Sequence, residues 1–481
     1  LGASRLNFPT PQTPEMSQGG SAATDKDNSG TSYSFTRKSY FGRIAYDYME
    51  KYLLEVQARY DGSSTFPKGE QYGFFPSVSA GWRVSKEEWF KNVSFINDLK
   101  LRGSYGTLGN DNVGLFQYFD NYSFVNQYVV GGQIIPGIDL TKLGNPFITW
   151  EIAKKMDLGL NMAFLQHFNL EFIYFQQKRS KILTQRNASL PQTSGIVNPF
   201  DPAIPLVPAE NIGKVNSNGI EATLGYDNTT GSGFHYNVSG NITYAKNKII
   251  FIDEAPGTLP YQRQTGGPMN TSLLYDAIGI FRTADELNKY PHPAGAQPGD
   301  LIYRDVNGDG QINADDQTRT KYGNIPEITY GIILGGDYKG FDLSLLFAGQ
   351  TNVSQYVLPE SGTIGNYYSS WADNRWSPSN PNGSYPRVDE RASASVNGGR
   401  YANTFWLNDA SFLRLKNVSL GYTFSSGVLS RIRIGSLRVY ANAFNLFTIT
   451  RVKDYDPEGT SSSGQFYPQQ RIINLGVNVR F

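Results

Sequence analysis

The C-terminal end of the chain constrains its fold most strongly, because residues 471–481 alternate between apolar and polar side chains. One set of alternate positions is entirely apolar: Ile473, Leu475, Val477, Val479 and Phe481. An extended strand with a period of two places this set on one face and the intervening, mostly small or polar positions on the other. About 9–11 residues are enough for a tilted β-strand to cross a bilayer. The segment is therefore predicted to be a transmembrane strand or a half-buried strand of a soluble β-sandwich, and the remainder of the chain decides between the two.

The same alternation recurs along most of the chain. Together with the C-terminal segment, the recurrences predict about thirteen strands, at 44–48, 54–60, 76–84, 99–105, 158–164, 168–181, 220–226, 236–244, 327–338, 341–349, 418–424 and 437–448. The alternation is less regular in 437–448 than in the other segments, and a short helical turn is expected near 86–90.

The connections between these segments alternate between short and long. The short ones lie at 50–51, 166–167, 229–233, 339–340 and 425–436, and the long ones at about 107–147, 184–215, 246–326, 350–410 and 450–470. Transmembrane β-barrels have short periplasmic turns and long outer loops, whereas a tandem of soluble β-domains has no reason to maintain that alternation. We therefore expect residues 37–481 to form transmembrane antiparallel barrel strands, with 1–36 as an outer loop or a ragged N-terminal end.

Composition is consistent with this class and excludes others. The mean hydropathy is −0.40, as expected when every second strand residue faces water, and no run of 18 apolar residues could form a transmembrane helix. The 43 basic and 42 acidic residues nearly cancel, which argues against a nucleic-acid partner. The absence of Cys excludes a disulfide scaffold. Because Leu1 is not a start methionine and no signal peptide is visible, we expect a processed or partial chain.

The predicted strand count also indicates a partial barrel. Single-chain bacterial barrels have an even number of strands, and about thirteen is odd. The sequence is therefore expected to be the C-terminal part of a larger barrel. A total of about 22 strands, as in plugged outer-membrane transporters, would leave about nine unaccounted for.

Several longer blocks resemble the SusC/RagA family of TonB-linked outer-membrane transporters. The blocks are YFGRIAYDY at 40–48, KYLLEVQARYDGSS at 51–64, FPSVSAGWRVS at 75–85, LKLRGSYGTLGN at 99–110, NIGKVNSNGIE at 211–221, DLIYRDVNGDG at 300–310, NRWSPSNP at 374–381, FLRLKNVSLGY at 412–422, NAFNLFTIT within 437–450, and DPE at 456–458. They occur in the family's order from about residue 37 to the C-terminus.

This resemblance implies the fold, function and partners of the whole transporter. It implies a 22-stranded barrel, an N-terminal plug with a periplasmic TonB box, and a SusD-like lipoprotein that closes the outside as a lid. TonB-dependent import of a glycan or peptide oligomer across a Gram-negative, Bacteroidota-like outer membrane is the expected function. The plug and the TonB box are not in this sequence, so the chain is expected to supply barrel wall, in contact with lipid, and outer loops.

The strongest local motif, DVNGDGQINADD at 305–316, matches an EF-hand-type calcium loop. Calcium takes six to eight oxygen ligands, and such a loop supplies them from its first, third, fifth, seventh and twelfth positions. These positions are Asp305, Asn307, Asp309, Gln311 through its carbonyl, and Asp316. The last is Asp instead of the usual bidentate Glu, and no helical pattern flanks the loop. The alternatives are a structural Ca²⁺ site or an Asp/Asn/Gly-rich turn that binds nothing.

Aromatic residues in the long segments are candidates for stacking on sugar rings or peptides. They are Tyr367, Tyr368, Trp371, Trp376, Tyr385, Tyr401 and Trp406. The alternatives are packing between loops or an interfacial aromatic girdle. Glu151, Asp157 and Glu221 are expected to face the barrel interior, where they contact a plug or simply line a solvated wall.

No catalytic site is predicted. The three histidines, His167, His235 and His292, are isolated, and neither an HExxH nor a GxSxG motif occurs. A glycosidase-type carboxylate pair remains an alternative, because Asp and Glu are abundant. A purely structural or adhesive outer-membrane barrel is the third functional class.

Overall fold

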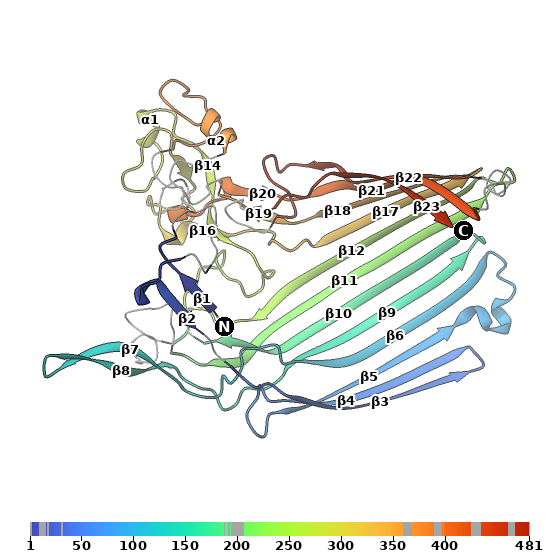
Figure 1. The fold of residues 1–481 in the computed structure, drawn as a ribbon, viewed down its shortest axis with the longest axis horizontal. Helices are drawn as coiled ribbons and strands as arrows, with labels where there is room; N and C mark the ends of the chain where they lie inside the picture. Colours follow the sequence, from blue (N-terminus) through green and yellow to red (C-terminus); the bar gives the residue numbers. More distant parts are fainter. Residues whose placement is uncertain are drawn as a thin grey trace.

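A thirteen-stranded antiparallel sheet dominates the computed structural model (Figure 1). The structure describes residues 2–8, 16, 19–29, 32–186, 188–190, 193, 206–358, 368–388, 397, 399–424, 434–459 and 467–480. The strands of the sheet are β3 (Arg37–Tyr48), β4 (Tyr52–Ser63), β5 (Tyr72–Arg83), β6 (Ile96–Asn110), β9 (Glu151–Phe164), β10 (Phe168–Gln185), β11 (Ala209–Thr229), β12 (His235–Phe251), β17 (Ile328–Tyr338), β18 (Phe341–Thr351), β21 (Phe412–Thr423), β22 (Ser436–Thr450) and β23 (Ile472–Arg480).

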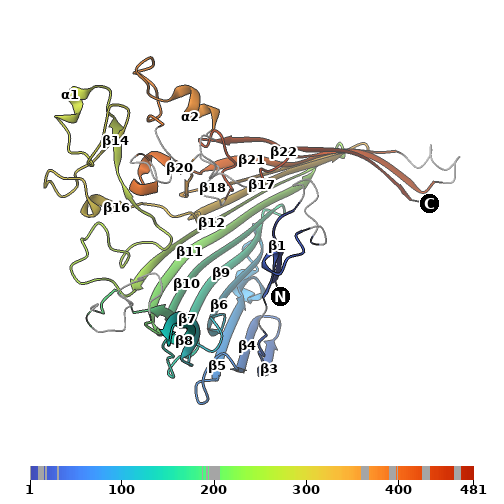
Figure 2. The same ribbon diagram turned by 60° about the vertical axis from the view of Figure 1, so that its left-hand side comes forward.

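Each of these strands pairs with the next one along the chain, so the sheet is an up-and-down meander with β3 and β23 at its two edges. The sheet twists and curves as a section of a barrel wall does, and it stays open within the described residues (Figures 1 and 2). The predicted fold, about thirteen strands of a partial antiparallel barrel, is confirmed.

Tight turns join the strands at one end of the sheet. Three of these turns place two consecutive residues at positive φ: Met49 and Glu50, Leu165 and Gln166, and Lys339 and Gly340. Two adjacent residues at positive φ are typical of type I′ turns, whose twist matches that of paired strands. The predicted helical turn between β5 and β6 is present as two 3-10 turns, Val84–Lys86 and Glu88–Phe90.

Long segments gather at the opposite end and carry small elements of their own (Figure 1). These elements are β7 (Asn121–Val130), β8 (Gln133–Lys142), β13 (Leu273–Tyr275), β14 (Ala277–Ile280), α1 (Ala284–Leu287), β15 (Leu301–Tyr303), β16 (Gln317–Arg319), β19 (Ser354–Tyr356), α2 (Ser369–Asn374) and β20 (Leu407–Asp409). A further two-stranded sheet, β1 (Gly2–Arg5) with β2 (Lys26–Ser29), lies in the N-terminal segment. The division of the chain at residue 37 stays a prediction.

The large apolar side chains of the strands lie exposed on one face of the sheet. Ile44 is 74% exposed, Leu158 52% and Leu475 84%. Buried apolar clusters instead lie where the long segments meet the strand ends, for example Phe66, Phe75, Ile148 and Trp150. An apolar sheet face of this extent is stable only when another apolar phase covers it, and a barrel wall meets that requirement with lipid.

The strands are longer than a bilayer crossing requires. β11 has 21 residues, about twice the length needed to cross at a tilt. The outer parts of such strands therefore extend past the hydrocarbon layer and support the long segments. Within the described ranges, no helix combines the length and apolar character that a membrane crossing demands.

Candidate functional site

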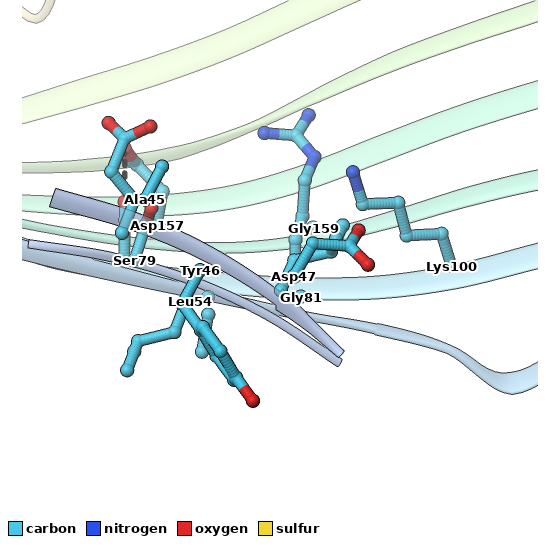
Figure 3. A pocket seen from close by; sticks show the side chains of 15 residues that line it. Ala45, Tyr46, Asp47, Leu54, Ser79, Gly81, Lys100, Asp157 and Gly159 are labelled. Atoms are coloured by element: carbon cyan, nitrogen blue, oxygen red, sulfur yellow. Dashed lines mark hydrogen bonds between the residues drawn. The ribbon is translucent and has the colours of Figure 1, made fainter. Parts of the chain in front are cut away.

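The inner face of the sheet carries the polar and charged side chains that a water-filled passage requires. A hollow of about 550 Å³ lies on this face. Among its lining residues, Asp47, Lys100 and Asp157 lie on the side of the sheet opposite to Tyr46 and Leu54 (Figure 3). The charged and the apolar side chains lie on opposite sides because successive residues of a strand point to opposite faces of the sheet. Because charged groups are much more stable in water than in hydrocarbon, this face has to line a hydrated interior.

Ion pairs on the inner face connect strands that are not direct neighbours. Arg102 on β6 contacts Glu171 on β10 at 2.6 Å and donates to Asn161 on β9 at 3.0 Å. Arg438 on β22 contacts Asp342 on β18 at 2.5 Å, across the intervening β21. These pairs hold the inner wall together without contributing an apolar surface.

A cluster of three tyrosines forms the centre of one outer unit. Tyr401 packs against Tyr275 and Tyr303, with ring centroids 5.1 and 5.8 Å away. Burial raises the pKa of the Tyr303 hydroxyl well above its ordinary value, and the Asn403 side chain donates a hydrogen bond to it at 3.2 Å. Ile312, from the predicted calcium loop, packs into the same cluster.

Trp371 and Trp406 form a second cluster, with ring centroids 4.6 Å apart. Both are almost fully buried, and each indole N–H donates to a backbone carbonyl, that of Pro386 for Trp371 and that of Asn397 for Trp406. The Tyr385 ring lies beside them, 6.1 Å from that of Trp406 and tilted by 33° against it. These rings pack the loops together, and a substrate could reach the two tryptophans only after the loops had separated.

The remaining aromatic candidates are more varied. Trp376 packs against the tyrosine cluster. Tyr368 is 38% exposed and meets Tyr455 edge-on at 4.9 Å. Tyr367 lies outside the described residues. The structure therefore does not bring the six described candidates together into one binding surface, and the contact of all seven with substrate stays a prediction.

The loop at 305–316 is closed by hydrogen bonds from its own backbone. Asp305 accepts from the N–H groups of Gly308 and Gly310 at 2.7 and 2.9 Å, and both glycines have positive φ. Asp316 is fully buried, and its two oxygens accept from the N–H groups of Val306 and Asn313 at 2.8 and 2.9 Å. These bonds fold the acidic run into a compact turn.

The loop oxygens that do not accept these backbone hydrogen bonds form only part of the ligand set that a hard cation needs. In the part of the chain that the structure describes, no three His, Cys, Asp or Glu side chains are grouped closely enough to hold a metal ion. A calcium ion would therefore need Asn307 and backbone carbonyls beside the carboxylates of Asp305 and Asp309, which is within the usual oxygen ligand set. The calcium site stays a prediction.

A buried ion cluster that sequence analysis missed lies at the outer end of β21. The Arg414 side chain is 2% exposed and contacts Asp456 at 2.9 Å and Glu458 at 2.5 Å. Its Nε donates to the Thr448 hydroxyl at 2.9 Å. Burial alone would raise the pKa of the Asp456 carboxyl, but hydrogen bonds from the Glu458 N–H and from Arg414 outweigh it and hold the pKa below its ordinary value. The cluster fastens the segment after β22 to the sheet.

A β-bulge at Lys416 sets the direction in which Arg414 points. The pairing of β21 with β18 skips this residue, since Leu346 is opposite Asn417 and Phe347 is opposite Leu415. If all residues of β21 alternated regularly, without the bulge, Arg414 would lie on the same lipid-facing side as Val418 and Leu420. Because a bulge adds one residue to one strand, Arg414 lies on the inner face instead.

The three histidines occupy separate places. The two ring nitrogens of His235 lie 2.7 and 2.9 Å from carboxylate oxygens of Asp337 and Asp227, at the end with the short turns. His167 contacts the carbonyl of Asp227, and His292 the carbonyl of Pro293. These contacts do not assemble a catalytic group.

Comparisons with known proteins agree with this geometry. The family described as "TonB dependent receptor-like, beta-barrel" matches residues 2–291. The chain is 31% identical over 474 residues to TonB-dependent receptor P3 of Formosa agariphila, covering 92% of this chain and 45% of that protein. It is 26% identical over 466 residues to TonB-dependent receptor SusC of Bacteroides thetaiotaomicron, covering 93% of this chain and 44% of that protein. The chain thus spans about half the length of the curated relatives it matches.

Solved structures show the same fold. The RagAB peptide transporter matches with a TM-score of 0.74 at 23% identity, covering 98% of this chain and 50% of the matched chain. Together with the sequence matches, it confirms the resemblance that the motifs indicated.

Proposed function

Because this chain belongs to the TonB-dependent receptor-like β-barrel family, we propose that it forms the C-terminal part of the wall of an outer-membrane importer. The observation that supports this most directly is the thirteen-stranded sheet, with an apolar outer face, a charged inner face and tight turns at one end only. A barrel of about 22 strands would require about nine more. The importer would work in the outer membrane of a Gram-negative, Bacteroidota-like cell, and the importer as a whole would not be an enzyme.

The proposed importer has partners outside this chain. A plug inside the barrel would contact the charged inner face, TonB would displace that plug, and a SusD-like lipoprotein would close the outer side as a lid. The matches to SusC and RagAB support this arrangement. The substrate would be a glycan or peptide oligomer that passes along the polar wall.

The test measures uptake by cells that carry the full-length protein. Fluorescent maltooligosaccharides and peptides are supplied to cells with and without TonB, and a deletion strain serves as the control. We expect uptake of one class that disappears without TonB, and co-purification of a lipoprotein with the barrel. Uptake that is independent of TonB, or no uptake by a correctly inserted barrel, would contradict the proposal and favour an adhesive or structural barrel.

We propose in addition that the loop at 305–316 holds a structural Ca²⁺, supported by its oxygen-rich side chains and its packing through Ile312 into the tyrosine cluster. Removing calcium from the full-length protein with a chelator is then expected to accelerate proteolysis within 246–326 and to weaken lid docking, because the carboxylates would repel one another without the cation. The measurement is the rate of limited proteolysis, with added Mg²⁺ as the control. An unchanged cleavage rate in chelator would rule the site out.

A further inference from the structure

We propose that a polar hollow at the outer end of β18 is a binding subsite for an uncharged, hydroxyl-rich ligand, an oligosaccharide segment. The hollow measures about 600 Å³ and lies between loops that are far apart in the sequence. Residues that line it include Asn270, Tyr322, Asn324, Gln350, Gln355 and Glu458. This inference rests on the proposed import function and names the class of solute that the hollow would select.

Gln355, on β19, lines the hollow and carries a buried hydrogen-bond acceptor. Its side chain is 7% exposed, and its Nε2 donates to the carbonyls of Asp456 and Gly459 at 3.1 and 2.9 Å. Because both partners are acceptors, these bonds fix which end of the amide is the nitrogen. The amide oxygen has no hydrogen-bond partner among the described residues. A buried acceptor without a donor is costly, so a small shift of the Gln355 side chain toward the hollow would favour a ligand that supplies a hydrogen-bond donor such as a hydroxyl.

The charges around the hollow select against ionic ligands. Glu458 is the one charged side chain in the lining, and it is already paired with Arg414. A carboxylate, sulfate or phosphate would find no unpaired cation among the lining residues that the structure describes. The amides of Asn270, Asn324 and Gln350 can each donate and accept, as the hydroxyls of a neutral sugar require.

The position of the hollow connects it with the interior of the barrel. Gln350 lies on the same face of β18 as Asp342, whose partner Arg438 belongs to the inner wall. β19 and β20 lie beside the outer end of β18 in Figure 1. A ligand held there would lie at the outer mouth, on the inward-facing side, where a solute enters the passage.

The experiment measures binding to the full-length transporter in detergent by isothermal titration calorimetry. The probes are maltohexaose, xylohexaose and mannohexaose, with hexagalacturonate as the anionic probe and a capped, uncharged Gly-Ser hexapeptide. The variants are Asn324→Ala and Tyr322→Ala at the rim and Gln355→Met at the base. Asn382→Ala, an exposed asparagine of another outer segment, is the matched control. Asn324→Ala removes only an exposed side chain. It therefore still tests the subsite if Gln355→Met loosens the adjacent loop.

We expect at least one neutral hexasaccharide to bind, and each subsite variant to weaken that binding by about three- to tenfold, with the control within about twofold. Equal binding by Asn324→Ala, Tyr322→Ala and the control would overturn the subsite. So would tighter binding of hexagalacturonate or of the peptide, or no binding of any neutral hexasaccharide. If binding fails in one of these ways but TonB-dependent uptake persists, the subsite is rejected and the import function stands. If the unchanged protein shows no TonB-dependent uptake, the proposed function itself is rejected.

Discussion

Replacing Arg414 with alanine is expected to lower the free energy of unfolding of the full-length protein by about 3 kcal/mol, because it leaves two acidic side chains at a buried site without their cationic partner. Asp456 is 9% exposed, whereas Glu458 is 34% exposed and regains water more easily. This difference places the expected loss at the lower end of the range for broken buried ion pairs. The measurement is reversible urea unfolding of the barrel in phospholipid, followed by tryptophan fluorescence.

A matched control is available one strand away. Arg451 is 85% exposed on its side chain and contacts Asp409 at 3.4 Å. Exposed ion pairs contribute about 0–1 kcal/mol, so Arg451→Ala should have little effect. If the two alanine variants were equally stable, the cluster around Arg414 would not hold the outer segment to the sheet.

Placing arginine at Ile242 is expected to destabilise the barrel by about 2–4 kcal/mol, the cost of an arginine on the lipid face near the bilayer midplane. Ile242 lies near the middle of the alternating part of β12, and its side chain is 43% exposed. The same unfolding measurement applies, and reduced insertion into the outer membrane of the cell is a second readout.

The neighbouring position provides the control. Thr243 points to the opposite face and lies directly across from Glu221 on β11, so an arginine there meets water and a carboxylate. Thr243→Arg should change the stability by less than about 1 kcal/mol, as expected for a change on a lumen-facing side. Equal losses at the two positions would mean that the two faces of the sheet are not lipid and water.

The strands could be predicted from sequence because their cause is local. A strand that separates lipid from water needs alternation at every second residue, and residues 473–479 or 236–244 display it without reference to any distant segment. The short turns could be predicted for the same reason. The irregular pattern in β22 also has a local cause, since its pairing with β21 shifts register beside Asn445, which has a positive φ.

The outer segments could not be predicted in the same way, because their structure depends on contacts between distant residues. Tyr275 packs against Tyr401, and the buried carboxylate of Asp300 pairs with Arg387 at 2.7 Å. No periodicity signals such contacts. Trp371 and Trp406 were predicted as candidate substrate contacts by residue type alone. Residue type cannot distinguish a ring that packs loops together from one that binds a ligand.

The extra residue in β21 determines how this strand responds to changes in length. Deleting Lys416 would close the bulge, because Leu415 and Asn417 already lie opposite the adjacent residues Phe347 and Leu346, and Arg414 would stay on the inner face. Substituting Lys416 would keep the count and leave that orientation unchanged. At this position, therefore, one residue can be lost without turning Arg414 toward hydrocarbon, and deleting Lys416 should be tolerated better than a deletion in a regular part of the strand.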